Sequence, residues 1–102
     1  MHDLTRLGQL IDLLETKMPK FIIERNFAEK LELTADGTAS IQQINDDEEV
    51  RWIVSFLSAD KRKSYCLYEA QDAESIKRAA DRAGVPADVI MSVDEFDPAI
   101  FA

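Results

Sequence analysis

The chain has 102 residues, 46% of them hydrophobic and 31% charged, with a formal net charge of -8. This length predicts a single domain with its own core, and no apolar run is long enough for a membrane span. Twenty acidic against twelve basic residues repel phosphate backbones and anionic lipid surfaces, so we expect neither nucleic acid nor a membrane as a partner. One cysteine and the lack of a secretory signal pattern favour a soluble protein of the reducing cytoplasm.

The first segment predicts a helix, because its apolar residues between Leu4 and Leu14 are three and four positions apart. Met18 comes just before the point at which the spacing of the apolar residues changes from helical to alternating. We therefore expect residues 1–17 to form an N-terminal helical arm and residues 18–102 to form the folded domain. The arm is either a docking helix for a partner or a loosely ordered extension.

The next segments predict a strand and a weak helix. In KFIIERNF, residues 20–27, alternate positions fall on opposite faces, and Arg25 shares the face of Phe21 and Ile23. Thr34 is an N-cap candidate for the helix that follows, which Gly37 weakens.

Two further runs predict an antiparallel hairpin around a solvated basic turn, residues 58–63. The first run is VRWIVSFL, and strict alternation predicts one face formed by Val50, Trp52, Val54 and Phe56. Its opposite face is then formed by Arg51, Ile53, Ser55 and Leu57. In the second run, KSYCLYEA, Cys66 and Tyr68 share one face, whereas Tyr65, Leu67 and Glu69 share the other.

The clearest helix follows Asp72, a strong N-cap candidate, and carries an apolar stripe that starts at Ile76. Gly84 and Pro86 predict its end. A last strand is predicted from Val89 to about Phe96.

This order of elements predicts an α+β, ferredoxin-like βαββαβ sandwich with an extra N-terminal helix. The helices of such a fold cover only one face of the sheet. Because both faces of the predicted strands carry apolar side chains, we expect the second face to be covered in a homodimer.

Four stretches also resemble a known family: FIIER, RWIVSFLS, DKRKSYCLYEA and ESIKRAADRAGVPADVI. The resemblance spans roughly residues 19–95 and points to an uncharacterised bacterial family of small ferredoxin-like proteins, a domain of unknown function with a nickel-binding branch. Membership implies the same fold, and the nickel-binding branch points to a divalent metal such as nickel as a cofactor. The nickel-binding branch is richer in histidine on its first strand, where this chain has Glu24, Arg25 and Asn26.

The residues themselves offer few metal ligands. Nickel and zinc prefer imidazole or thiolate, and the chain has one histidine, His2, and one thiol, Cys66. Glu24 and Glu69 are weak candidates for a site that takes a harder divalent ion.

A candidate pocket joins Arg25, Trp52, Cys66 and Tyr68, which the predicted strands place on inward faces. A half-buried arginine requires a carboxylate or an anionic ligand, because an unpaired buried charge is costly. No histidine is near Cys66 in the sequence, so we interpret the thiol as a packed side chain and not as a nucleophile.

No phosphate loop, HExxH, CxxC pair or GxSxG motif is present. We therefore interpret the protein as a small non-enzymatic binding protein that acts as a dimer and holds a small molecule or a divalent metal. The first alternative is a small dimeric α+β-barrel enzyme with Arg25, Trp52 and Tyr68 in its cavity. The second is a structural interaction module that uses the helix of residues 4–15.

Overall fold

The computed structural model describes residues 18–101. Its elements in chain order are β1 (Lys20–Asn26), α2 (Ala35–Asp47), β2 (Arg51–Leu57), β3 (Lys63–Glu69), α3 (Ala73–Ala83), β4 (Val89–Val93) and a short 3₁₀ helix (Pro98–Phe101). The four strands form one antiparallel sheet in the order β2-β3-β1-β4. The predicted ferredoxin-like α+β fold is therefore confirmed. The predicted helical arm, residues 1–17, lies outside the described residues.

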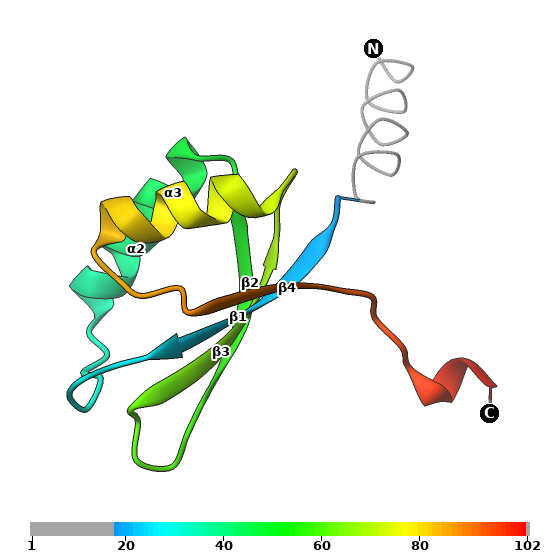
Figure 1. Ribbon diagram of the computed structural model, residues 1–102, viewed down its shortest axis with the longest axis horizontal. Helices are drawn as coiled ribbons and strands as arrows, with labels where there is room; N and C mark the ends of the chain where they lie inside the picture. Colours follow the sequence, from blue (N-terminus) through cyan, green and yellow to red (C-terminus); the bar gives the residue numbers. More distant parts are fainter. Residues whose placement is uncertain (1–17, 102) are drawn as a thin grey trace.

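Both helices lie on the same side of the sheet, which we call the covered face (Figure 1). In the part of the chain described, no helix lies against the opposite face, which we call the open face. The segment after β4 leaves the body of the domain and ends in the 3₁₀ helix. None of the helices between residues 18 and 101 is long and apolar enough to span a bilayer.

The helix ends follow the predicted capping chemistry. Thr34 precedes α2, and its Oγ1 accepts a hydrogen bond from the amide of Gly37 at 3.0 Å. A side chain at position 37 would bring its Cβ to 2.9 Å from that Oγ1, so the glycine that lowers helix propensity also makes room for the cap. Asp72 caps α3 by accepting from the Ser75 amide at 2.9 Å, and α3 ends at Gly84 with φ 69°.

The core lies between α3 and the central strands. Ile23 of β1 and Ile76 of α3 are the largest fully buried side chains among the described residues. The small side chains of Ala79 and Ala80 let α3 pack closely on the sheet, as the predicted stripe indicates. The side of α3 away from the sheet is tied to the end of α2, where Arg78 and Arg82 contact Glu48 at 3.2 and 3.0 Å. These hydrogen bonds hold the pKa of Glu48 below its usual range.

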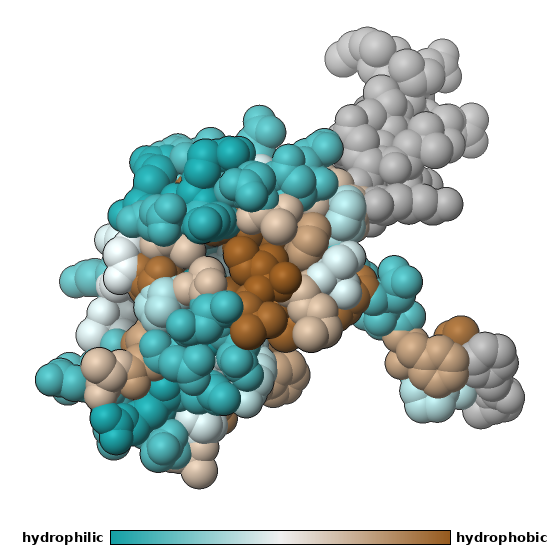
Figure 2. Space-filling model, in the orientation of Figure 1, coloured by the Kyte–Doolittle hydropathy of each residue, from teal (hydrophilic) through white to brown (hydrophobic). Residues whose placement is uncertain are grey.

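The open face is largely apolar. Val54, Leu67, Ile22 and Met91 lie in one row across all four strands. Exposed large hydrophobic side chains of β2, β3 and β4 on this side are Ile53, Val54, Phe56, Tyr65, Val89 and Met91. Figure 2 shows hydrophobic side chains gathered along the sheet near β4, between the hydrophilic helix surface and the hydrophilic β2–β3 turn.

Two details of the predicted strands are wrong. Strict alternation placed Val54 and Phe56 on the face of Trp52, but the pairing with β3 shifts between Trp52 and Val54. This β-bulge adds one residue to β2 and reverses the facing of every residue after it. Val54 and Phe56 thus lie on the open face, whereas Ser55 and Leu57 lie on the covered face. Strand β4 also ends at Val93 instead of continuing to about Phe96.

Candidate ligand cavity

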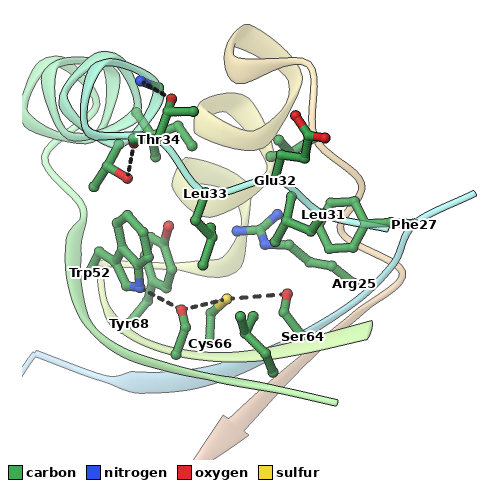
Figure 3. A pocket seen from close by; sticks show the side chains of 16 residues that line it. Arg25, Phe27, Leu31, Glu32, Leu33, Thr34, Trp52, Ser64, Cys66 and Tyr68 are labelled. Carbon is green, nitrogen blue, oxygen red and sulfur yellow. Dashed lines mark hydrogen bonds between the residues drawn. The ribbon is translucent and has the colours of Figure 1, made fainter. Parts of the chain in front are cut away.

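A cavity of about 280 Å³ opens on the covered face of the sheet. Its floor comes from β1, β2 and β3, one wall comes from the first turns of α2, and the other comes from the loop of residues 27–34 (Figure 3). Most of its lining is apolar, including Phe27, Leu31, Leu33, Ile41 and Leu57. Leu33, which is 61% exposed, points into the space between Trp52 and Arg25.

The β2–β3 turn holds the loop that forms the second wall. The amides of Phe27 and Leu31 donate to the carbonyls of Arg62 and Lys61, each at 2.8 Å, and the Arg62 guanidinium donates to the carbonyl of Ala28. Lys61 and Arg62 are exposed, as a solvated turn predicts. The basic turn therefore holds the cavity wall in place, and its charged residues are at the same time exposed to solvent.

A chain of polar groups crosses the floor of the cavity. Trp52 Nε1 donates to Ser55 Oγ at 2.7 Å, and Ser55 Oγ donates to Cys66 Sγ at 3.0 Å. Ser64 Oγ lies 3.6 Å from the same sulfur (Figure 3). The β-bulge makes this chain, because it brings Trp52 and Ser55, three positions apart, to the same face.

Arg25 closes the end of the cavity nearest the α3–β4 connection. Its side chain is buried, with 6% of the residue exposed, and Nη1 donates to the carbonyl of Pro86 at 2.5 Å. The guanidinium carbon lies 5.8 Å from the centroid of the Tyr68 ring. None of the ion pairs in the described part of the chain includes Arg25.

Tyr68 links the cavity to the core. Its ring is stacked with that of Trp52, with centroids 6.4 Å apart and an interplanar angle of 8°. The amide of Asn45 donates to its hydroxyl at 3.5 Å. Burial raises the pKa of Tyr68, and the nearby Arg25 cation and the Asn45 hydrogen bond oppose that rise.

The four residues of the candidate pocket, Arg25, Trp52, Cys66 and Tyr68, all line this one cavity. Sequence reasoning missed the rest of the lining, above all Leu31 and Leu33, although apolar residues two apart in a polar segment were a signal. Ser55 was missed because alternation assigned it to the other face. Glu32 is the one carboxylate among the lining residues of the described part of the chain, and its side chain is exposed at the rim.

The candidate metal ligands do not come together. Glu24 and Glu69 lie on the open face, where Glu24 contacts Lys63 at 3.4 Å and Glu69 contacts Arg51 at 3.7 Å. Within residues 18–101, no group of three or more His, Cys, Asp or Glu side chains is arranged to hold a metal ion. His2 lies outside the described residues. The donors of this part of the chain therefore do not fit nickel, which prefers converging imidazole or thiolate ligands.

Comparison with known proteins identifies the family. A protein-family model described as nickel responsive protein SCO4226-like matches residues 21–93. The crystal structure of SCO4226 from Streptomyces coelicolor A3(2) is similar, with 26% sequence identity and a TM-score of 0.59 over 76% of this chain and 99% of that chain. No curated protein sequence is a significant match. The match covers both halves of the βαββαβ fold and most of the described residues, and the chain therefore belongs to the SCO4226-like family of nickel-responsive proteins.

Proposed function

We propose that this protein is a small non-enzymatic binding protein that holds an organic ligand in the cavity on the covered face. The observation that carries the proposal is the cavity itself: an apolar space of about 280 Å³ that contains one buried cation, Arg25. Ligand sites typically combine apolar walls with a few polar groups that orient the ligand.

The lining favours binding over catalysis. General acid–base or nucleophilic catalysis requires a positioned base, and among the lining residues that belong to the described part of the chain there is no histidine. Cys66 is in contact with two serine hydroxyls and not with a base. The family description connects these proteins with nickel, but the donors in residues 18–101 support an organic ligand better than a metal.

We also propose that the protein acts as a homodimer through its open face. Phe56 is 63% exposed there and Met91 56%, beside the exposed Val54 and Val89. A continuous apolar surface on a sheet face is typical of a contact surface. The ion pairs Lys63–Glu24 and Arg51–Glu69 lie on the same face, so its charged side chains are paired within one protomer.

The cavity is tested with 1-octanol, a neutral probe, in a titration followed by the fluorescence of Trp52, the only tryptophan of the chain. Thr38→Phe places a ring in the cavity wall, and Ala39→Phe places the same ring at the next, exposed position of α2. We expect a saturable change for the unmodified protein and for A39F, and about tenfold weaker binding for T38F. Equal binding by the two variants would place the probe elsewhere, and the proposal would be wrong.

The dimer is tested by light scattering at micromolar concentration. Phe56→Lys introduces a charge into the open face, and Ile100→Lys makes the same change in the exposed 3₁₀ helix. We expect the mass of a dimer for the unmodified protein and for I100K, and the mass of a monomer for F56K. A monomeric mass for the unmodified protein contradicts the proposal.

A further inference from the structure

Arg25 is a buried cation whose hydrogen-bonding capacity is largely unused. A guanidinium presents several N–H donors in a planar fork, and the Pro86 carbonyl takes a donor from Nη1 alone. No carboxylate in the described part of the chain pairs with it. A buried charge without an anionic partner is unfavourable, so the residue is suited to a ligand that supplies the missing charge.

The Arg25 guanidinium lies at the cavity. Among residues 18–101, the Arg25 guanidinium donates from Nη1 to the Pro86 carbonyl, and the Tyr68 hydroxyl is also within its hydrogen-bonding reach. Neither of these partners is a carboxylate, so the positive charge of Arg25 stays without an anionic partner although the residue is buried. Because Arg25 lines the cavity beside Phe27, Leu31 and Leu33, its guanidinium borders a mostly apolar space (Figure 3).

We propose that the cavity binds a small amphipathic monocarboxylate, whose carboxylate accepts two hydrogen bonds from the Arg25 guanidinium. Its hydrocarbon part lies between Leu33 and Trp52, over the floor of Ser55 and Cys66. This inference rests on the proposed function and names the class of its ligand. The planar fork of arginine matches the two oxygens of a carboxylate.

The charge and the volume of the cavity narrow the chemical class of the ligand. A phosphate monoester carries about two negative charges and several acceptor oxygens, whereas this cavity offers one cation and mostly apolar walls. Glu32 at the rim and a net charge of -8 further disfavour a multiply charged anion. A volume of about 280 Å³ holds about nine non-hydrogen atoms at ~30 Å³ each, which corresponds to a chain of about eight carbons or a compact aromatic acid.

The test compares octanoate with octanamide, which has the same length and no charge, by titration of Trp52 fluorescence at about pH 7, where octanoate is ionised. Hydrogen bonds to a charged group are stronger than neutral ones, so we expect octanoate to bind about ten- to a hundredfold more tightly than octanamide. Octylamine, which places a cation beside Arg25, should bind most weakly.

Three variants test whether Arg25 causes the preference for octanoate. Arg25→Met should bring the affinity for octanoate down to that for octanamide, whereas Lys77→Met, which makes the same change of net charge on the exposed surface of α3, should leave the preference intact. Arg25→Lys keeps the charge without the fork and should give an intermediate preference. If R25M does not fold because the bond to Pro86 is lost, R25K and the ligand series with the unmodified protein still decide the matter.

The outcomes separate the two proposals. Saturable binding of octanoate and octanamide with equal affinity would overturn the carboxylate assignment and leave the binding function intact. A preference for octanoate that survives in R25M would also overturn the role of Arg25. If none of the probes, 1-octanol included, changes Trp52 fluorescence in a saturable way, the binding function itself is wrong.

Discussion

The two faces of the sheet depart from the usual pattern of a two-layer domain in different ways. The covered face, which packs against α2 and α3, contains the Arg25 guanidinium, the Ser64 hydroxyl and the Cys66 thiol. The open face, which has no helix against it, carries exposed aliphatic and aromatic side chains such as Phe56 and Met91. A two-layer α+β domain usually has apolar groups under the helices and polar groups facing water, so the buried polar groups of the covered face and the exposed apolar groups of the open face are the exceptions.

This difference between the two faces indicates which kind of functional surface each one forms. Polar groups are retained under the helices at a cost in stability, and Arg25, Ser64 and Cys66 all line the cavity there. Apolar groups on the open face also cost free energy in water unless a partner covers them. The covered face therefore has the composition of a ligand site, and the open face has that of a contact surface.

The largest expected effect is the difference in stability loss between alanine variants at two neighbouring isoleucines of β1. Ile23 is fully buried under the helices, so Ile23→Ala should lower the free energy of unfolding by about 2–5 kcal/mol. Ile22 lies on the open face and is half-buried, so Ile22→Ala should cost about 1 kcal/mol or less in dilute protein. Urea unfolding measures both changes.

Measurements at several protein concentrations test the difference between I22A and I23A further. If the open face is a dimer contact, the loss for I22A grows with protein concentration, because the dimer stabilises the folded state by mass action, while the loss for I23A changes little. Equal losses for the two variants in dilute protein would contradict the distinction between a covered and an open face.

Alternation in the sequence predicted which residues of β1 and β3 lie on the covered face and which on the open face. It did not do so for β2. In β1 and β3 alternation is unbroken, so the buried positions Ile23, Arg25, Cys66 and Tyr68 follow from the pattern alone. In β2 apolar residues occupy both faces, and the extra residue of a bulge leaves no signal in a run such as WIVSF. The predicted facing of Ser55 was wrong for that reason.

The cavity could be predicted only in part. The inward strand residues Arg25, Trp52, Cys66 and Tyr68 were identified, but the wall of residues 27–34 depends on hydrogen bonds to the β2–β3 turn. Such contacts join residues thirty or more positions apart and follow no local period. Periodicity reports the face on which a residue lies and not the distance between two loops.

The second effect contrasts two tyrosines of β3. Tyr68→Phe removes the hydroxyl that accepts from Asn45, a side chain of which only 2% is exposed. Leaving that amide unsatisfied should cost about 1–3 kcal/mol. Tyr65→Phe on the open face should change stability by less than about 0.5 kcal/mol. Urea unfolding of both variants tests the contrast, and similar values would show that the Asn45 bond contributes little.

The third effect concerns the single thiol. Cys66 is 5% exposed and packs in the core cluster, so Cys66→Ala should cost about 1 kcal/mol. A disulfide reagent should label Cys66 more slowly in native buffer than in denaturant. In the C66A background, Phe56→Cys moves the thiol to the open face, where labelling should approach the denatured rate in dilute protein. Native labelling of Cys66 faster than the denatured rate would instead indicate an activated thiolate.

The smallest effect is a dependence of stability on alkaline pH. Burial raises the pKa of Tyr68 above its ordinary value of 10.0. As the pH rises through that value, the unfolded chain releases the phenolic proton while the folded protein still holds it, so the folded state binds more protons and the free energy of unfolding falls with pH. We expect the fall between about pH 9 and about pH 11 to be shallower for Y68F than for the unmodified protein. Lysines titrate in the same range in every variant, so the difference between variants, measured by urea unfolding, isolates Tyr68. The same slope in Y68F and in the unmodified protein would mean that the covered face is hydrated enough to ionise Tyr68 as freely as in the unfolded chain.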